Sequence, residues 1–97
     1  MNLIKLSKKI IKYTNKLNST NLSSFRSGNI SVRVKKKGLE GFFITPSGKK
    51  YSSLKPIDIV FVSLKGKFDK KKGKPSSEWR FHQDIYVNKK EAKAIVH

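Results

Sequence analysis

Cysteine is absent from the 97 residues, and acidic side chains are scarce, with 6 Asp and Glu against 23 Lys and Arg. Without cysteine, disulfide scaffolds and thiolate metal sites are both excluded. No apolar run approaches the ~20 residues that span a bilayer, so no membrane segment is expected. Charges also interrupt the basic start at residues 1–9, which argues against a secretory signal and makes the cytoplasm the expected location.

The shortage of acids gives the chain a formal net charge of +17. Such a charge favours nucleic-acid binding through phosphate neutralisation, and a solvated lysine surface is the competing interpretation. The lysines gather mostly at expected turns, arginine is rare, and aromatic and basic residues do not alternate as they do in base-stacking proteins. The distribution therefore favours the solvated lysine surface, a nucleic-acid partner is not expected, and the charge alone does not identify a function.

Periodic apolar residues divide the first half of the chain into a helix and a hairpin. Apolar residues at three- and four-residue spacing predict an amphipathic helix over residues 3–17. Ile30, Val32 and Val34 alternate with polar residues and predict a strand, and residues 41–45 predict a second strand after a turn at 36–38. A loop with proline and glycine at 45–48 then ends the hairpin.

The second half predicts a strand, a helix and a final strand. Residues 57–64 read as a largely buried strand, and Phe68 as the start of a short return strand. Ser76 or Ser77 is expected to cap a helix that runs to about residue 87, and residues 92–96 form a last apolar strand. The buried side of this helix is expected to carry Phe81, Ile85 and Tyr86. This order of elements indicates a mixed α/β (α+β) domain.

Three loops at the ends of these elements carry residues suited to phosphate oxygens. They contain small hydroxyl residues or glycines with free backbone N–H groups, and the third opens a helix. Turns use the same residues, so each loop alone is a weak indication, and the three together are a stronger one. The three loops are Ser27-Gly28-Asn29, Thr45-Pro46-Ser47-Gly48 and Pro75-Ser76-Ser77.

Glu78 follows the third loop and is the candidate acid or base. Its plainest role is to complement the helix dipole. His82 lies one turn later and could share a metal with Glu78, although packing inside the helix is the more ordinary role. His97 could be another ligand, but two ligands do not complete a zinc site, which normally takes about four, three of them from protein in catalytic sites. From the residues alone, the outcome is a phosphate cradle with an incomplete metal site.

Four blocks of the sequence, taken in order, resemble the class II aldolase/adducin family. The blocks are SGNISVR at 27–33, ITPSG at 44–48, KPSSEW at 74–79 and AIVH at 94–97. The third block, extended through Arg80, Phe81 and His82, is most similar to the fuculose-phosphate-cleaving members. The resemblance implies an α/β/α sandwich around a mainly antiparallel sheet, and oligomers that are typically tetramers.

The resemblance also implies a function and assigns roles to individual residues. It implies zinc-dependent cleavage of a phosphorylated sugar to dihydroxyacetone phosphate and an aldehyde. Glu78 matches the acid/base that also touches the metal, and His97 matches the first histidine of the family's His-x-His zinc motif. The residues matching the phosphate and substrate pocket are Gly28, Asn29, Ser47, Gly48, Ser76 and Ser77. Trp79 is expected to pack rather than to react.

The sequence departs from the family pattern after residue 97, where the second histidine of the motif and the C-terminal half are missing. We therefore expect residues 1–97 to be the N-terminal portion of a longer domain, truncated at His97, with an incomplete sandwich and no activity alone. Three alternatives stay open: a sugar-phosphate epimerase or dehydratase of the same family, an adducin-like structural module, and a basic nucleic-acid-binding module.

Overall fold

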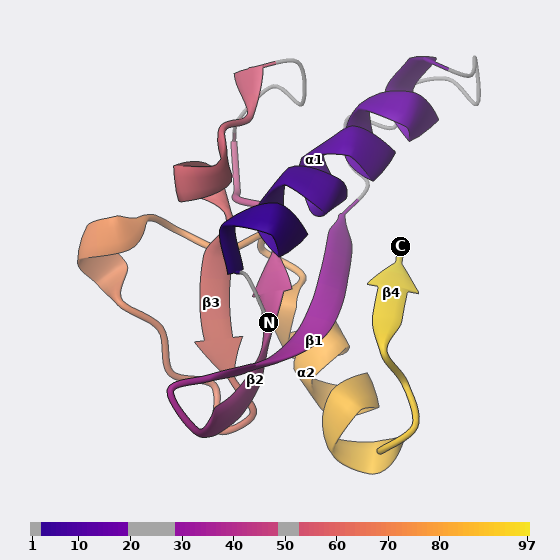
Figure 1. The fold of residues 1–97 in the computed structure, drawn as a ribbon. Helices are drawn as coiled ribbons and strands as arrows, with labels where there is room; N and C mark the ends of the chain where they lie inside the picture. Colours follow the sequence, from indigo (N-terminus) through magenta and orange to yellow (C-terminus); the bar gives the residue numbers. More distant parts are fainter. Residues whose placement is uncertain (1–2, 20–28, 49–52) are drawn as a thin grey trace.

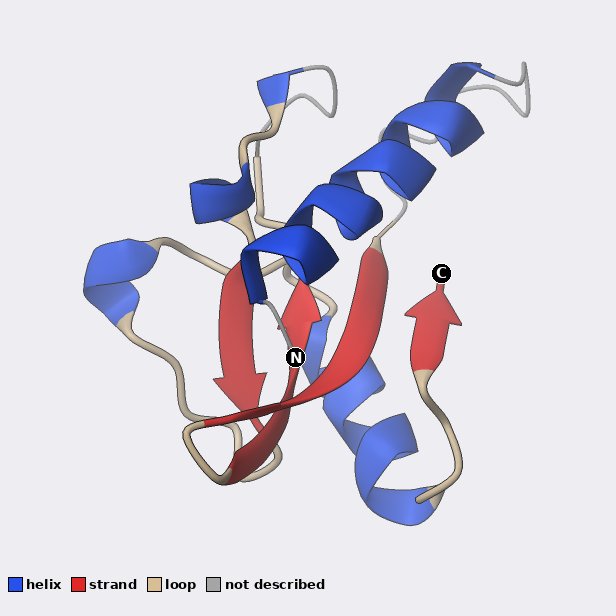
Figure 2. Cartoon of the chain, viewed as in Figure 1, coloured by secondary structure: helices blue, strands red, loops and turns tan. Residues whose placement is uncertain are grey.

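A computed structural model describes residues 3–19, 29–48 and 53–97 of the chain. Its helices and antiparallel strands are coloured along the sequence in Figure 1 and by type in Figure 2. In order they are α1 (Leu3–Ser19), β1 (Ile30–Lys36), β2 (Leu39–Ile44), the 3-10 turn η2 (Pro56–Asp58), β3 (Val60–Ser63), the 3-10 turn η3 (Lys70–Lys72), α2 (Trp79–Asn88) and β4 (Ala94–Val96).

The strands form one antiparallel sheet in the order β3-β2-β1-β4. β1 and β2 are joined by a two-residue turn at Lys37 and Gly38, whose φ angles of 51° and 82° are both positive. Positive φ at both central residues gives the turn a twist that matches the flanking strands, so the hairpin forms locally. β4 returns from the far end of the sequence to pair with the other edge of β1, where Ser31 lies opposite Ile95.

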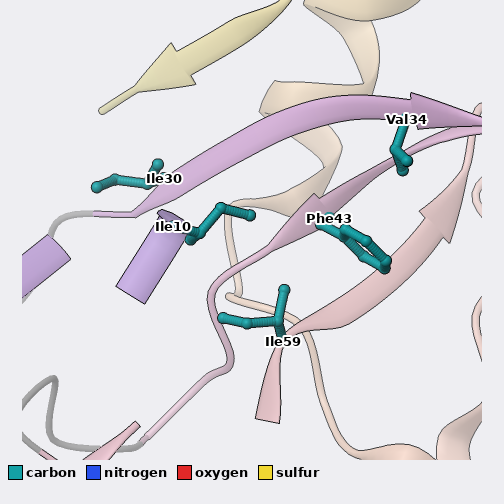
Figure 3. Packing of buried hydrophobic residues seen from close by; sticks show 5 residues of the cluster. All are labelled: Ile10, Ile30, Val34, Phe43 and Ile59. Carbon is teal, nitrogen blue, oxygen red and sulfur yellow. The ribbon is translucent and has the colours of Figure 1, made fainter. Parts of the chain in front are cut away.

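Two helices cover opposite faces of this sheet, as Figure 1 shows. The hydrophobic cluster under α1 contains Ile10, Ile30, Val34, Phe43 and Ile59, which point toward one another in Figure 3. The cluster under α2 contains Phe42, Ile44, Val60, Val62 and Tyr86. The three layers confirm the α/β/α arrangement around an antiparallel sheet.

Several predicted boundaries are wrong, and proline explains the largest error. The strand expected at 57–64 begins only at Val60, because Pro56 starts a 3-10 turn in which Ile57 is 81% exposed. Proline favours the first position of a helical turn and has no N–H to donate to a sheet. Phe68 belongs to no strand; its ring instead meets Trp79 edge-on, with centroids 5.7 Å apart.

The second helix begins later than predicted, and it buries Tyr86 as expected but His82 in place of Phe81. Its N-cap is Glu78, not Ser76 or Ser77. Phe81 is 47% exposed, whereas His82 is fully buried beside Tyr86. The polar His82 thus lies in the core, where hydrophobicity had predicted its neighbour Phe81. No helix in the described part of the chain is both long and apolar enough to cross a membrane.

Candidate functional site

The loop that follows β2 lies against the loop that precedes α2. The carbonyl of Thr45 accepts a hydrogen bond from the Ser76 N–H at 2.9 Å, and the Ser47 N–H donates to the carbonyl of Lys74 at 3.0 Å. These bonds bring two of the three predicted phosphate-binding loops together at one end of the sheet. The sequence placed them 29 positions apart, counting from Ser47 to Ser76.

The predicted phosphate contacts in these two loops differ in exposure. Ser47, Gly48 and Ser77 are exposed, so the two serine hydroxyls and the Gly48 backbone are accessible to a ligand, whereas the Ser47 N–H is already bonded to the Lys74 carbonyl. Gly48 has φ of +77° and open space around its Cα, as a close backbone approach to a ligand requires. Ser76 is buried, and its Oγ accepts the N–H of Glu78 at 3.3 Å. Gly28 lies outside the described residues.

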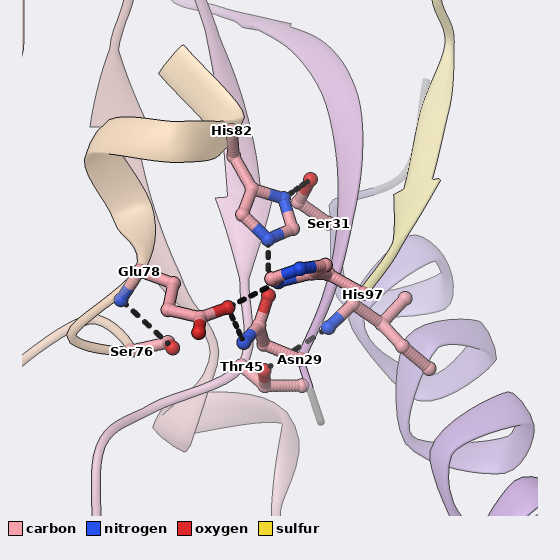
Figure 4. Close-up of polar contacts among 8 residues, drawn as sticks. Asn29, Ser31, Thr45, Ser76, Glu78, His82 and His97 are labelled. Carbon is pink, nitrogen blue, oxygen red and sulfur yellow. Dashed lines mark hydrogen bonds and ion pairs between the residues drawn. The ribbon is translucent and has the colours of Figure 1, made fainter. Parts of the chain in front are cut away.

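Three residues that are far apart in the sequence meet at the N-terminus of α2. Asn29 precedes β1, His97 follows β4, and their backbones exchange two hydrogen bonds of 2.8 and 2.9 Å. This pairing places both side chains beside Glu78, as Figure 4 shows. The Asn29 Nδ2 donates to the Glu78 Oε2 at 2.8 Å, and the His97 Nδ1 contacts the same oxygen.

These contacts control the charge of Glu78. The hydrogen bond from Asn29 is the main cause that holds the pKa of this carboxyl below its usual range, and the contact with His97 adds to it. Hydrogen bonds that favour the ionised form lower a pKa. The side chain is 41% exposed, so a ligand can reach it. Glu78 is therefore an ionised, accessible carboxylate at neutral pH, able to accept a proton.

His97 is held in place from a second side. Its ring stacks on Phe81, with centroids 4.5 Å apart and planes 26° apart. Half of its side chain, 47%, is exposed. The exposed Phe81 thus has a definite role, because it supports the imidazole that reaches Glu78.

One role considered for His82 was to bind a metal together with Glu78, and its surroundings do not favour that role. Its side chain is fully buried, its Nε2 contacts the Asn29 Oδ1, and its Nδ1 lies 2.5 Å from the Ser31 Oγ. Burial lowers its pKa to about 4, and the neighbouring His97 adds to this shift. The imidazole is therefore neutral at neutral pH and acts as a hydrogen-bonding group.

Two further buried residues, Ser31 and Tyr86, belong to this network; the sequence predicted that Tyr86 is buried but assigned neither residue to the site. The Ser31 and Tyr86 hydroxyl oxygens are hydrogen-bonded at 2.8 Å, and burial raises the pKa of Tyr86 to about 12. Ser31 was counted only as a polar position in an alternating strand. The available signal was Tyr86, which lies one turn after His82 and therefore on the same helical face.

The donors beside Glu78 are of the types that zinc accepts, but they are few. A carboxylate and an imidazole nitrogen meet here, whereas a catalytic zinc takes three protein ligands. In the described part of the chain, no group of three His, Cys, Asp or Glu side chains could hold a metal. Residues 3–19, 29–48 and 53–97 thus supply at most two ligands, Glu78 and His97.

Trp79 packs, as predicted. Its ring lies edge-on to Phe68, and the Arg80 guanidinium lies 5.2 Å from its centroid. It also borders Gly66, whose φ of +81° makes the turn after β3. The indole anchors the N-terminus of α2 on this turn and so supports the position of the preceding Glu78.

The chain has clear relatives among known proteins. Residues 8–97 match the family described as Class II Aldolase and Adducin N-terminal domain. All 97 residues align with an L-fuculose phosphate aldolase of Haemophilus influenzae at 41% identity, covering 43% of that protein. They also align at 43% identity with a 5-methylthioribulose-1-phosphate/5-deoxyribulose-1-phosphate aldolase of Escherichia coli, again covering 43% of it.

The fold agrees with the sequence comparison. A solved L-fuculose 1-phosphate aldolase superposes on 96% of this chain with a TM-score of 0.85 and 35% identity, and the match covers 43% of that structure. The chain therefore spans less than half the length of the relatives that it matches.

Proposed function

Since the chain belongs to the class II aldolase and adducin family, we propose that it is the N-terminal portion of a zinc-dependent aldolase. The substrate class is a sugar phosphate of the L-fuculose 1-phosphate type, cleaved to dihydroxyacetone phosphate and an aldehyde. The observation that carries the proposal is the ionised, accessible Glu78, held by Asn29 and placed beside His97. The names of the relatives support a sugar phosphate as substrate.

In this proposal Glu78 moves the proton. Aldol cleavage breaks a carbon–carbon bond, removes a proton from a substrate hydroxyl and delivers a proton to the carbon that keeps the bonding electrons. The lowered pKa of Glu78 keeps its carboxylate ionised at neutral pH, which is the form that accepts a proton, although it also makes the group a weaker base than an ordinary glutamate. Its exposed face then allows the resulting acid to return a proton to the substrate.

The two adjoining loops hold the phosphate in this proposal. Ser47 and Ser77 offer their hydroxyls, and Gly48 offers its backbone N–H, on the exposed side next to the N-terminus of α2. A helix N-terminus favours an anion, and fixing the phosphate positions the reacting carbons. Asn29 and Ser76 are buried and contribute by holding Glu78 and its loop.

Zinc is the expected cofactor, and Glu78 and His97 are the residues of this chain that would hold it. When bound, zinc polarises substrate oxygens and stabilises developing negative charge. Because a catalytic zinc takes three protein ligands, the remaining ligand or ligands would come from residues beyond the described ones. The tetrameric state and the cytoplasmic location stay predictions.

The first test is a zinc titration of the 97-residue chain by calorimetry, with an assay for cleavage of L-fuculose 1-phosphate. We expect weak zinc binding and no cleavage, because two ligands do not complete a site. Tight stoichiometric binding or measurable cleavage would contradict the assignment of the chain as a portion of the enzyme.

The second test supplies the missing part. Residues 1–97 are fused to the segment of the Haemophilus influenzae relative that follows the matched region, and the chimera is assayed with zinc. We expect cleavage, and a loss of about 10²–10⁴-fold in kcat for Glu78→Gln, which keeps the shape but cannot accept the proton. A chimera that folds and binds zinc but does not cleave the substrate would contradict the proposed function.

The relative from Escherichia coli favours a second substrate, 5-methylthioribulose 1-phosphate. Comparing kcat/KM for the two sugar phosphates in the same chimera decides between them. Epimerase, dehydratase and adducin-like roles stay alternatives. For a nucleic-acid-binding role, a titration with DNA at rising salt is decisive, since binding through phosphates weakens steeply with salt.

A further inference from the structure

Five side chains form a continuous line of hydrogen bonds from the core to the candidate site. The Tyr86 hydroxyl lies 2.8 Å from the Ser31 Oγ, which lies 2.5 Å from the His82 Nδ1. On its other side, the His82 Nε2 contacts the Asn29 Oδ1, and the Asn29 Nδ2 reaches the Glu78 Oε2 at 2.8 Å. Figure 4 shows the line from Ser31 to Glu78. The first four residues are at most 2% exposed.

The carboxylate at the end of the line fixes the direction of every bond in it. An ionised carboxylate only accepts, so the Asn29 amide must turn its NH₂ group toward Glu78 and its oxygen toward His82. The amide oxygen in turn requires a proton on the His82 Nε2. A neutral ring then leaves Nδ1 as an acceptor, to which Ser31 donates, and Tyr86 donates to Ser31. All donors therefore point toward Glu78.

We propose that Tyr86, Ser31 and His82 are positioning residues, whose one-directional chain of hydrogen bonds fixes the Asn29 amide and, through it, the carboxylate of Glu78. The proposal rests on the function proposed above only in making Glu78 the group that moves the proton. Hydrogen bonds aligned in this way polarise one another and strengthen the whole chain.

His82 is the residue on which the orientation depends. Without its N–H, the Asn29 amide could rotate and turn its oxygen toward the carboxylate, where two acceptors would face each other. The ring also packs beside two aromatic rings: its plane lies 21° from that of Phe42, with centroids 6.4 Å apart, and it meets Phe81 edge-on. Packing thus holds the ring while hydrogen bonds set its tautomer.

The first measurement is the tautomer of His82 in the unmodified 97-residue chain, read from its imidazole ¹⁵N signals by NMR. We expect a neutral ring with its proton on Nε2 and none on Nδ1. A proton on Nδ1 would overturn the proposal, because the Asn29 amide oxygen would then lack its donor. This result needs no variant and no turnover.

The second measurement is the exchange rate of the Asn29 side-chain amide protons with solvent. We expect His82→Leu to accelerate exchange by about tenfold or more, because the amide loses its fixed partner. His82→Gln retains an N–H donor on a side chain of comparable reach and should restore slow exchange. Equal exchange in the unmodified chain and in folded His82→Leu, or equal behaviour of the Leu and Gln variants, contradicts the proposal.

Asn88 provides the matched control on the same helix. Its Nδ2 donates to the Asp84 carbonyl at 2.8 Å and to the Asp84 Oδ1 at 3.0 Å, in an exposed position. Its exchange should not respond to His82→Leu, whereas general unfolding would accelerate Asn29, Asn88 and the sheet amides together. Since none of these readouts depends on catalysis, their failure is separate from failure of the aldolase assignment.

Discussion

The two faces of the sheet are packed in different ways, and β1 contributes to both. On the α1 side, Ile30 and Val34 join a purely apolar cluster around Ile10 and Phe43. On the α2 side, the alternate residues of the same strand, Ser31 and Arg33, make hydrogen bonds to α2 and to the turn after it. The α1 face is therefore held by apolar packing, whereas the α2 face combines an apolar cluster with hydrogen bonds of defined direction.

The difference shows how the fold separates stability from function. Apolar packing tolerates exchanges of similar volume, because contacts between hydrocarbon groups have no preferred direction. A buried polar chain tolerates few exchanges, since each lost partner leaves a desolvated group unpaired. In the described part of the chain, every buried polar side-chain atom has a hydrogen-bond partner. The α2 face can therefore hold Glu78 in one orientation.

The largest effect is expected on the apolar face. Phe43→Ala removes a ring that is 5% exposed and meets Phe61 edge-on, with centroids 6.0 Å apart. The loss of buried area and the remaining cavity should lower the free energy of unfolding by about 3–5 kcal/mol. Urea unfolding measures this change. If the two faces are independent, folded Phe43→Ala keeps the His82 tautomer of the unmodified chain, and a changed tautomer would contradict that separation.

The next effect concerns the clamp that Arg33 forms on the C-terminus of α2. Its Nη2 donates to the carbonyls of Tyr86 at 2.8 Å and Lys89 at 3.0 Å, and its Nε donates to that of Ala92 at 2.7 Å. Charged donors at a helix C-terminus satisfy its free carbonyls. Arg33→Met should therefore lower the free energy of unfolding by about 1.5–3 kcal/mol.

Lys35→Met is the matched control for this prediction. Lys35 is exposed on the same strand, so its replacement removes one positive charge without removing the clamp. Its effect in urea unfolding should stay within about 0.5 kcal/mol. Equal effects of the two substitutions would show that charge, and not the guanidinium contacts, accounts for the change.

The smallest expected effect is the change in the free energy of unfolding with pH near neutrality, which comes from the titration of His82. The unfolded chain protonates His82 near its ordinary pKa of 6.5, whereas burial and His97 lower the pKa in the fold to about 4, against the opposing effect of Glu78. Protons then bind preferentially to the unfolded chain, so stability falls as the pH drops from 6.5 toward 4. Between about pH 7 and about pH 6, the loss should be about 1 kcal/mol or less.

The urea midpoint, measured across this pH range, tests the expectation. His82→Gln has no titrating group at this position and should show a flatter profile. Glu78, with its lowered pKa, adds a further loss of stability only below its ordinary value of 4.5. A profile that is identical in the unmodified chain and in His82→Gln would contradict a neutral, buried His82.

Local patterns in the sequence were enough to predict the first helix, the hairpin and the last strand. Their signals are periodicity and turn residues, which act over a few neighbouring positions. The strand predicted at 57–64 began too early, because apolar composition outweighed the effect of Pro56 on the backbone. Apolar character likewise placed Phe81 in the core, whereas Phe81 is exposed and His82, for which packing was one expected role, is buried.

Residue type and spacing alone determine that the chain has amphipathic segments, loops suited to a phosphate and a carboxylate at the start of a helix. Only the tertiary structure decides that Asn29 and His97 meet at Glu78, through the pairing of β4 with the edge of β1. It alone also buries Ser31 and His82, since a polar side chain can be buried only where a partner is supplied. That partner comes from another element, 51 positions away.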